Sequence, residues 1–198
     1  MPKPSVRSVL ITGGMLLWIL LVGAGLWWFN QENVKPGATG SPESRWPADA
    51  QLAAAPRHGH TLVLALHPEC PCSRATVEEL GVLLASSGDR LQARVLMVQY
   101  ADLHRPAEQS ALWKQAAALP GVFLQADPDG VESRRFAIKT SGDTRLYDAD
   151  GRLVFHGGIT ASRGHSGPNP GVDMIRSLVL ATGGDATLSS TPVFGCSL

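Results

Sequence analysis

The stretch His67-Pro68-Glu69-Cys70-Pro71-Cys72-Ser73-Arg74 decides the fold that this sequence predicts. An uninterrupted apolar run, residues 61–66, precedes it, and residues 73–85 carry apolar side chains at helical spacing. The first run is short enough for a buried strand, whereas the second predicts a helix. Two cysteines therefore lie where a strand turns into a helix. Because the first amides of a helix lack partners and carry partial positive charge, this position favours a thiolate.

The remaining elements predict an α/β fold. Residues 93–100 and 122–125 are strand-like, and 144–147 with 152–156 flank the turn Asp148-Ala149-Asp150-Gly151 as a hairpin. Helices are expected at residues 108–119, 131–138 and 172–182. Strands that alternate with helices and end in a hairpin predict a mixed sheet flanked by helices.

Composition narrows the classes of function. The 198 residues allow one globular domain with appendages, and 17 basic residues balance 17 acidic ones. A neutral chain without a basic stripe gives no reason to expect a nucleic-acid partner. The three cysteines are an odd number, which favours a redox or metal site over a scaffold of disulfides.

The N-terminal segment predicts a membrane anchor. Residues 8–29 contain no charge, and as a helix they would span about 33 Å, enough for the hydrocarbon core. Basic residues in 1–7 place the N-terminus in the cytoplasm and the remainder outside it. A cleaved signal peptide is the alternative, although its apolar core is usually shorter. Residues 30–45 read as a linker, so a folded domain is expected at 46–182, followed by a tail at 183–198.

The order of elements, with cysteines at the first strand-to-helix corner, resembles a thioredoxin-like domain on a membrane anchor. The sequence LALHPECPCSRATVEEL, residues 64–80, is similar to that family's strand, active-site turn and first helix. Residues 136–139 and 144–147 resemble its later strand and hairpin. HPECPC, SRGH at 162–165 and TPVFGC at 191–196 are also similar to a bacterial subgroup of anchored proteins labelled RedB. The resemblance implies a single-pass protein of the bacterial inner membrane, with its C-terminal domain in the periplasm or outside the cell.

Two features depart from the family pattern. The family separates its cysteines by two residues, whereas only Pro71 separates Cys70 from Cys72. The family also has a cis-proline before its hairpin, where this chain has Gly142, which can adopt unusual backbone angles. A disulfide between cysteines this close in sequence is expected to be strained, and therefore oxidising and labile. The alternative is that both are packed thiols.

Other residues are candidates to support the cysteines. Cys196 can return to the corner as a resolving thiol or a third metal ligand, or it is an ordinary tail thiol. His67 can stabilise a thiolate or bind a metal, and Glu69 can accept a proton from a thiol. His165 is a more distant candidate ligand. Each of these polar residues has an ordinary surface role as its alternative, as do Arg74 and Arg163, which can also bind an anion.

Two hypotheses of different classes follow. The first is a membrane-anchored, extracytoplasmic thiol–disulfide oxidoreductase that needs no cofactor and acts on a protein thiol or disulfide. Its site comprises Cys70, Cys72 and Cys196, supported by His67, Glu69, Pro71 and Gly142. The second is a copper-binding or chaperone module, because soft thiolates suit Cu(I). Its ligands would come from Cys70, Cys72, Cys196, His67 and His165. An inert docking domain is a third alternative.

Overall fold

The computed structural model describes residues 5–53, 59–101, 103, 105–181 and 187–198. Residues 1–4 of the predicted cytoplasmic end and residues 182–186, at the predicted junction of domain and tail, lie outside the described residues. The chain forms two compact units, one extending to Lys35 and the other comprising Pro36–Leu198.

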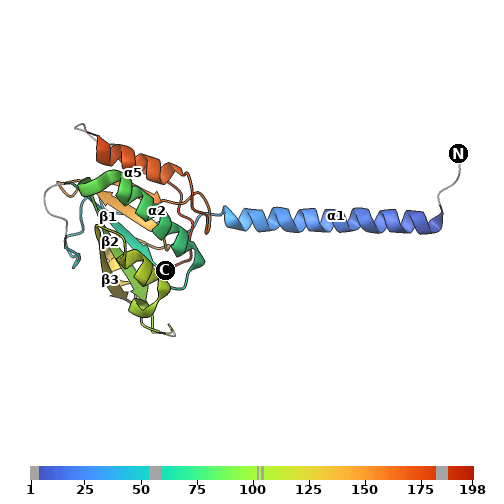
Figure 1. Ribbon diagram of the computed structural model, residues 1–198, viewed down its shortest axis with the longest axis horizontal. Coiled ribbons are helices and arrows are strands. Elements are labelled where there is room, and N and C mark those ends of the chain that lie inside the picture. Colours follow the sequence, from blue (N-terminus) through green and yellow to red (C-terminus); the bar gives the residue numbers. More distant parts are fainter. Residues whose placement is uncertain (1–4, 54–58, 102, 104, 182–186) are drawn as a thin grey trace. The chain divides into compact units, whose positions relative to one another are not determined.

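The first unit is one long apolar helix, α1 (Val6–Asn33), drawn in blue in Figure 1. Within Val6–Gln31 the most apolar window of 18 residues has a mean hydropathy of 2.3, and none of that window is buried. A helix of this length rises about 42 Å, which exceeds the hydrocarbon core of a bilayer. The predicted long apolar helix is therefore confirmed, and it is a candidate membrane span.

The second unit is built on a mixed sheet with the strand order β3-β2-β1-β4-β5-β6. The strands are β1 (His60–Leu66), β2 (Leu91–Gln99), β3 (Val122–Pro128), β4 (Asp143–Tyr147), β5 (Leu153–Gly158) and β6 (Ser189–Ser190). Strands β1, β2 and β3 are parallel, whereas β4 pairs antiparallel with both β1 and β5. The predicted mixed α/β sheet is thus confirmed.

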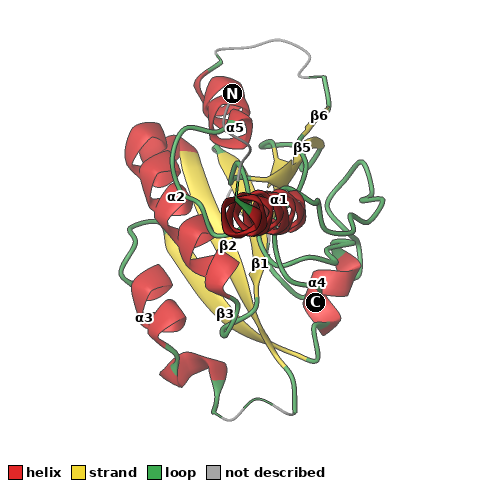
Figure 2. Cartoon of the chain, turned by 90° about the vertical axis from the view of Figure 1, so that its right-hand side faces the viewer, coloured by secondary structure: helices red, strands yellow, loops and turns green. Residues whose placement is uncertain are grey.

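Helices cover both faces of the sheet (Figures 1 and 2). The helices α2 (Pro71–Ser87), α3 (Ala111–Ala117) and α5 (Pro170–Leu180) contribute apolar residues to one core, and the short α4 (Val131–Arg135) leads into the other. Two 3-10 turns, η1 (Gly88–Arg90) and η2 (Ala107–Gln109), complete the connections.

Strand β1 separates the two hydrophobic cores. Leu62, Leu64 and Leu66 pack on the α2, α3 and α5 face, whereas Val63 and Ala65 pack on the opposite face. All five are fully buried because successive side chains of a strand point to opposite sides and both sides are covered. Residues 62–66 are therefore continuously apolar because each face of the strand packs against its own hydrophobic core.

Segments on either side of the expected domain also pack on this unit. The Gly37 amide donates to the Val193 carbonyl at 2.8 Å, and the Leu153 amide donates to the Ser44 carbonyl at 2.9 Å. Trp46 makes edge contacts with the rings of Phe136 and Tyr147. Backbone hydrogen bonds of this kind leave no pattern in composition, which is why residues 36–45 resemble a linker in sequence.

Strand β6 also has no counterpart among the sequence predictions. It pairs parallel to β5, with Ser189 opposite Phe155 and Ser190 opposite His156. Two consecutive serines carry neither apolar alternation nor β-branched side chains, so they provide no local signal for a strand. This pairing is where the C-terminal segment, residues 189–198, first contacts the sheet.

Candidate functional site

The corner between β1 and α2 places two cysteines in the first turn of a helix. Cys70 is the N-cap of α2 with extended dihedral angles, φ −80° and ψ 121°, and Pro71 is the first helical residue. Proline suits this position because its fixed φ matches a helix and its missing N–H would be unpaired there. The Cys70 side chain is buried, with 6% exposure, whereas Cys72 is half-buried and has a free thiol.

A closed set of hydrogen bonds fixes the corner. The His67 amide donates to Ser141 Oγ at 2.9 Å, and Ser73 Oγ donates to the His67 carbonyl at 3.0 Å. The two serine oxygens lie 2.8 Å apart. Since the Ser73 proton is engaged by His67, Ser141 is the donor in the serine pair. Both serines are almost completely buried, so the network ties the start of α2 to the segment before β4.

Gly142 has a positive φ, a backbone conformation that glycine adopts more readily than other residues. Its φ is +91°, and its amide donates to the Ala65 carbonyl at 2.8 Å. A Cβ at this position would lie 3.0 Å from Thr76 Oγ1 on α2. Glycine therefore lets the segment before β4 approach both β1 and α2 closely.

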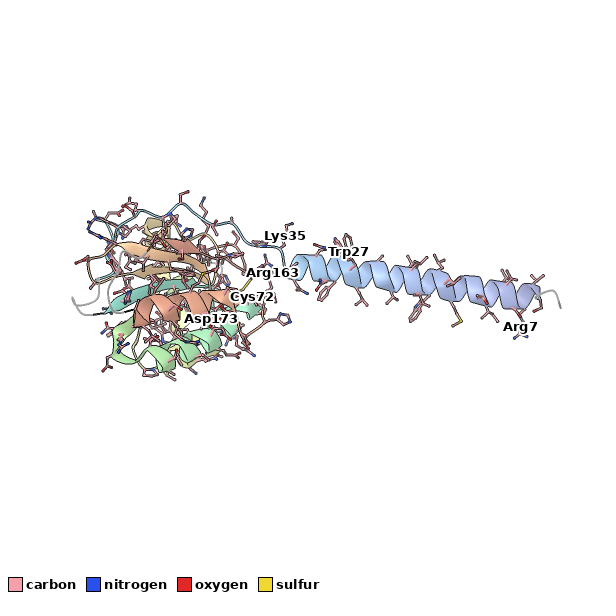
Figure 3. All side chains as sticks on the ribbon, turned by 90° about the horizontal axis from the view of Figure 1, so that it is seen from above. Arg7, Trp27, Lys35, Cys72, Arg163 and Asp173 are labelled. Carbon is pink, nitrogen blue, oxygen red and sulfur yellow. A yellow bond between two sulfur atoms is a disulfide. The ribbon has the colours of Figure 1, made fainter. Side chains whose placement is uncertain are left out.

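Cys196 lies at the corner and forms a disulfide with Cys70. Their Cα atoms are 6.4 Å apart, although 126 residues separate them in sequence. The sulfur atoms of Cys70, Cys72 and Cys196 all lie within 4.8 Å of one another. Figure 3 shows Cys72 at one end of the domain, the end that also carries Arg163. The disulfide thus joins the corner to the tail and leaves its close neighbour Cys72 free.

Backbone pairing holds the tail at this place independently of the disulfide. The Ser141 amide donates to the Cys196 carbonyl at 2.8 Å, and the Leu198 amide donates to the Lys139 carbonyl at 2.9 Å. Thr140 and Ser197 form an antiparallel bridge between these two bonds. The tail therefore pairs with residues 139–141 through one antiparallel bridge and its two flanking hydrogen bonds.

A glycine permits this close approach. A Cβ built on Gly195 would lie 1.8 Å from the Ser141 carbonyl oxygen, well inside contact distance. Arg163 Nη1 donates to the Gly195 carbonyl at 2.6 Å. Residue 195 is thus held from two sides, and only glycine fits without displacing the tail.

The loop that carries Arg163 is itself anchored to α2. The Glu79 side chain, which is 5% exposed, accepts hydrogen bonds from the Gly167 amide at 2.5 Å and from Asn169 Nδ2 at 3.1 Å. Asn169 in turn caps α5 by accepting from the Val172 amide. The helix that presents the cysteines therefore also positions the loop that contacts the tail.

A buried ion pair supports the segment on which the tail lies. Asp143 and Arg145 are both fully buried and form a salt bridge. Arg145 also donates to the Phe136 and Ala137 carbonyls, at 3.1 and 2.9 Å. Burial raises the pKa of Asp143, while the Arg145 guanidinium opposes that shift. The pair thereby fixes residues 136–143 from inside the domain.

The other candidate residues have local roles. His67 Nδ1 accepts from the Glu69 amide at 3.2 Å, and the Glu69 side chain is exposed. His165 is exposed, and its Nδ1 lies 2.7 Å from the Arg163 carbonyl oxygen. Within the described part of the chain, the group of atoms able to hold a metal comprises the three cysteine sulfurs, without either histidine.

A groove gives access to the corner. It has a volume of about 730 Å³ and is lined by Pro68, Glu69 and Cys70 from the corner, Arg74 and Glu78 from α2, and Leu112 and Gln115 from α3. Because the lining combines two carboxylates, one guanidinium and apolar atoms, the groove suits a peptide surface better than a small anion.

Three residues of the site escaped the sequence analysis. Ser73 and Ser141 fix the corner, and Gly195 admits the tail. Arg163 is expected from the sequence to be an anion ligand or an ordinary surface charge, whereas it donates to the tail backbone at the Gly195 carbonyl. Buried serines leave no distinctive pattern in one sequence. The pair Gly195-Cys196, a glycine directly before a cysteine, is the one local signal that could have been used.

Comparison with known proteins concerns the fold. No family model and no curated protein matches the chain. Among solved structures, an uncharacterized conserved protein from Geobacillus kaustophilus is similar over 83% of this chain and 91% of its own, with 16% identity and a TM-score of 0.60. A hypothetical protein from Sinorhizobium meliloti 1021 is similar over 83% and 93%, with 19% identity and a TM-score of 0.55.

Further structural neighbours have thioredoxin-like names. One is a secreted disulfide oxidoreductase of Mycobacterium tuberculosis, 18% identical over 61% of this chain and 80% of its own, with a TM-score of 0.43. The chain shares its overall fold with the two structures described above, whose TM-scores are 0.60 and 0.55. At these identities the likeness establishes architecture alone, so the similarity to the RedB subgroup stays a prediction.

Proposed function

We propose that this protein is a thiol–disulfide oxidoreductase whose redox-active disulfide joins Cys70 to Cys196. The observation that carries the proposal is the position of this disulfide, with one cysteine at a helix N-cap and the other on a segment that pairs with residues 139–141. The helix start stabilises a Cys70 thiolate after reduction. Cys196 lies on a short segment that pairs with residues 139–141 beside the corner.

The proposed exchange is balanced without a cofactor. In the reduced protein the Cys70 thiolate attacks one sulfur of a partner disulfide, and the partner's other sulfur leaves as a thiolate. The Cys196 thiolate then attacks Cys70 Sγ, which releases the partner's second thiolate and forms the Cys70–Cys196 disulfide. Two electrons pass to the partner, and the reverse sequence oxidises a partner dithiol. Pro71 and Gly142 hold the corner and the adjoining backbone during these steps.

The groove beside Cys70 is the proposed route for the partner. Its volume and mixed lining suit a polypeptide segment rather than a small thiol. Helix α1 serves as the proposed anchor, with residues 8–29 in the inner membrane and the thioredoxin-like unit in the periplasm. An oxidising compartment is consistent with a disulfide in the resting protein.

Redox titration of the full chain in detergent micelles tests the proposal. Equilibration in glutathione buffers of defined ratio, followed by alkylation and mass measurement, should show two thiols appearing together. A Cys196→Ser variant should accumulate a mixed disulfide on Cys70 with a peptide disulfide, whereas a Cys70→Ser, Cys196→Ser double variant should accumulate far less. Failure of the thiol count to change, together with no trapped species, would contradict the redox function.

A second function is favoured by the same three sulfurs. After reduction, three thiolates within 4.8 Å of one another form a set of soft donors suited to Cu(I). The structure provides no histidine in this group among its described residues. Competition with a Cu(I) chelator tests this alternative on the reduced full chain. Tight binding that is lost in Cys72→Ser would support copper handling, because that cysteine is dispensable for the disulfide.

A further inference from the structure

The free thiol of Cys72 lies beside a disulfide that it does not share. Its sulfur is within 4.8 Å of both disulfide sulfurs, and the residue as a whole is half-buried. Thiol–disulfide exchange needs only a thiolate and an accessible disulfide sulfur. The arrangement therefore contains all the groups required for an exchange inside one molecule.

We infer that Cys72 exchanges with the Cys70–Cys196 disulfide, so that Cys196 alternates between Cys70 and Cys72 as its partner. This inference rests on the proposed redox function and adds a step that determines whether Cys70 is free in the oxidised protein. The oxidised protein then has two forms, one with a Cys70–Cys196 bond and one with a Cys72–Cys196 bond. Only the second presents Cys70 as a thiolate.

The step is balanced within the protein. The Cys72 thiol loses its proton to solvent, and its thiolate attacks Cys196 Sγ. A bond forms between Cys72 Sγ and Cys196 Sγ, and the bond from Cys196 Sγ to Cys70 Sγ breaks with its electron pair on Cys70. One disulfide is present before and after, so no oxidant or reductant is consumed.

Two features direct the attack to Cys196 rather than to Cys70. Attack on Cys70 Sγ would close a ring over Pro71 alone, in a segment already fixed at the start of α2. Attack on Cys196 instead releases Cys70, whose thiolate the helix N-terminus stabilises, and a stabilised thiolate is the better leaving group.

The tail is built to allow the change of partner. Backbone bonds from Ser141 and Lys139 hold residues 196 and 198 against the domain whether or not the disulfide to Cys70 exists. Cys196 therefore remains near both cysteines during exchange. In the Cys70–Cys196 form the Cys70 sulfur is bonded and the residue has 6% exposure, so exchange to Cys72 is what frees a Cys70 thiolate in the oxidised protein.

Disulfide mapping of the oxidised full chain in detergent micelles tests the exchange. The sample is quenched in acid, then alkylated with N-ethylmaleimide under denaturing, mildly acidic conditions that suppress further exchange. Cys70 and Cys72 share every short peptide, but fragmentation before Pro71 in the mass spectrometer separates them. We expect label on Cys72 as the major species and on Cys70 as a minor species, with Cys72–Cys196 peptides in matching amount.

Two variants make the outcome decisive. In Cys70→Ser the inference predicts quantitative oxidation to Cys72–Cys196, with no free thiol, whereas two free thiols in that variant would overturn it. In Cys72→Ser all label should disappear from the oxidised protein. Label confined to Cys72 in the native chain, or a Cys70–Cys72 disulfide with label on Cys196, would also overturn the exchange. The proposed function is judged separately, by the appearance of two thiols in the glutathione titration of the native chain, which does not depend on which cysteine Cys196 pairs with.

Discussion

The corner at residues 67–73 and the tail at residues 191–198 contribute one cysteine each to the same disulfide, but they are positioned by different physics. The corner follows from local rules: a buried strand ends, a proline begins a helix, and Cys70 caps it. The tail has no periodic pattern and lies in place through backbone contacts with Ser141 and Lys139, far away in sequence. The position of Cys70 therefore depends on the local sequence, whereas the position of Cys196 depends on contacts between segments that are distant in sequence.

The strongest way to separate these regions is Gly195→Val. Its Cβ would meet the Ser141 carbonyl oxygen, so the tail should leave residues 139–141 and the disulfide should fail to form. We expect a loss of about 4–5 kcal/mol in the free energy of unfolding, measured by chemical denaturation of the full chain in micelles. Ser197→Val is the matched control, because residue 197 is exposed and should tolerate the change. Unchanged thiol counts in Gly195→Val would contradict the assigned role of Gly195.

Removing the disulfide while keeping the tail's backbone bonds should cost less. Cys196→Ser opens a loop that closes over 126 residues, and we expect it to lower the free energy of unfolding by about 3 kcal/mol under oxidising conditions. Under reducing conditions the variant and the native chain should be nearly equal. Cys72→Ser serves as control and should change stability little. An equal loss in both variants would show that the disulfide does not connect the two regions.

Ser141→Ala probes the contact between the regions from the side of the corner. The substitution leaves the His67 amide without its acceptor and the buried Ser73 oxygen without its donor, which should cost about 2 kcal/mol. Since the backbone amide of residue 141 remains, the tail should still pair and the disulfide should still form. Denaturation and thiol counting on the same samples measure both effects. Loss of the disulfide in this variant would show that the corner and tail are not independently held.

The smallest expected effect concerns pH. Burial lowers the pKa of His156, whose carbonyl accepts from the Thr191 amide at the start of the tail, and Arg145 lowers it further. The ordinary value is 6.5, so the unfolded chain binds a proton more readily than the folded one, and stability should fall as the pH drops from about 7 to 5.

His156→Gln should weaken that dependence, as measured by denaturation midpoints across the pH range. His60 also has its pKa lowered by burial, but it lies at the start of β1 and away from the tail. His60→Gln is therefore the comparison: it should weaken the pH dependence without altering the disulfide. A pH profile unchanged by either substitution would contradict both assignments.

The sequence alone determined the apolar N-terminal helix, the mixed α/β sheet and the two cysteines at the corner, because each depends on short-range rules. Residues 61–66 had to form a buried strand, and Pro71 suited only the start of the following helix. The departure at Gly142 was also visible, since a positive φ is a property that glycine supplies by itself.

Only the tertiary structure decided which cysteines pair. The choice between Cys72 and Cys196 depends on a tail that lies against residues 139–141 through main-chain hydrogen bonds. Every residue type carries the same amide and carbonyl groups, so such bonds leave almost no trace in a sequence. The position of Cys70 at a helix start therefore follows from the local sequence. Its pairing with Cys196 follows from the tertiary contacts that bring the tail to the corner.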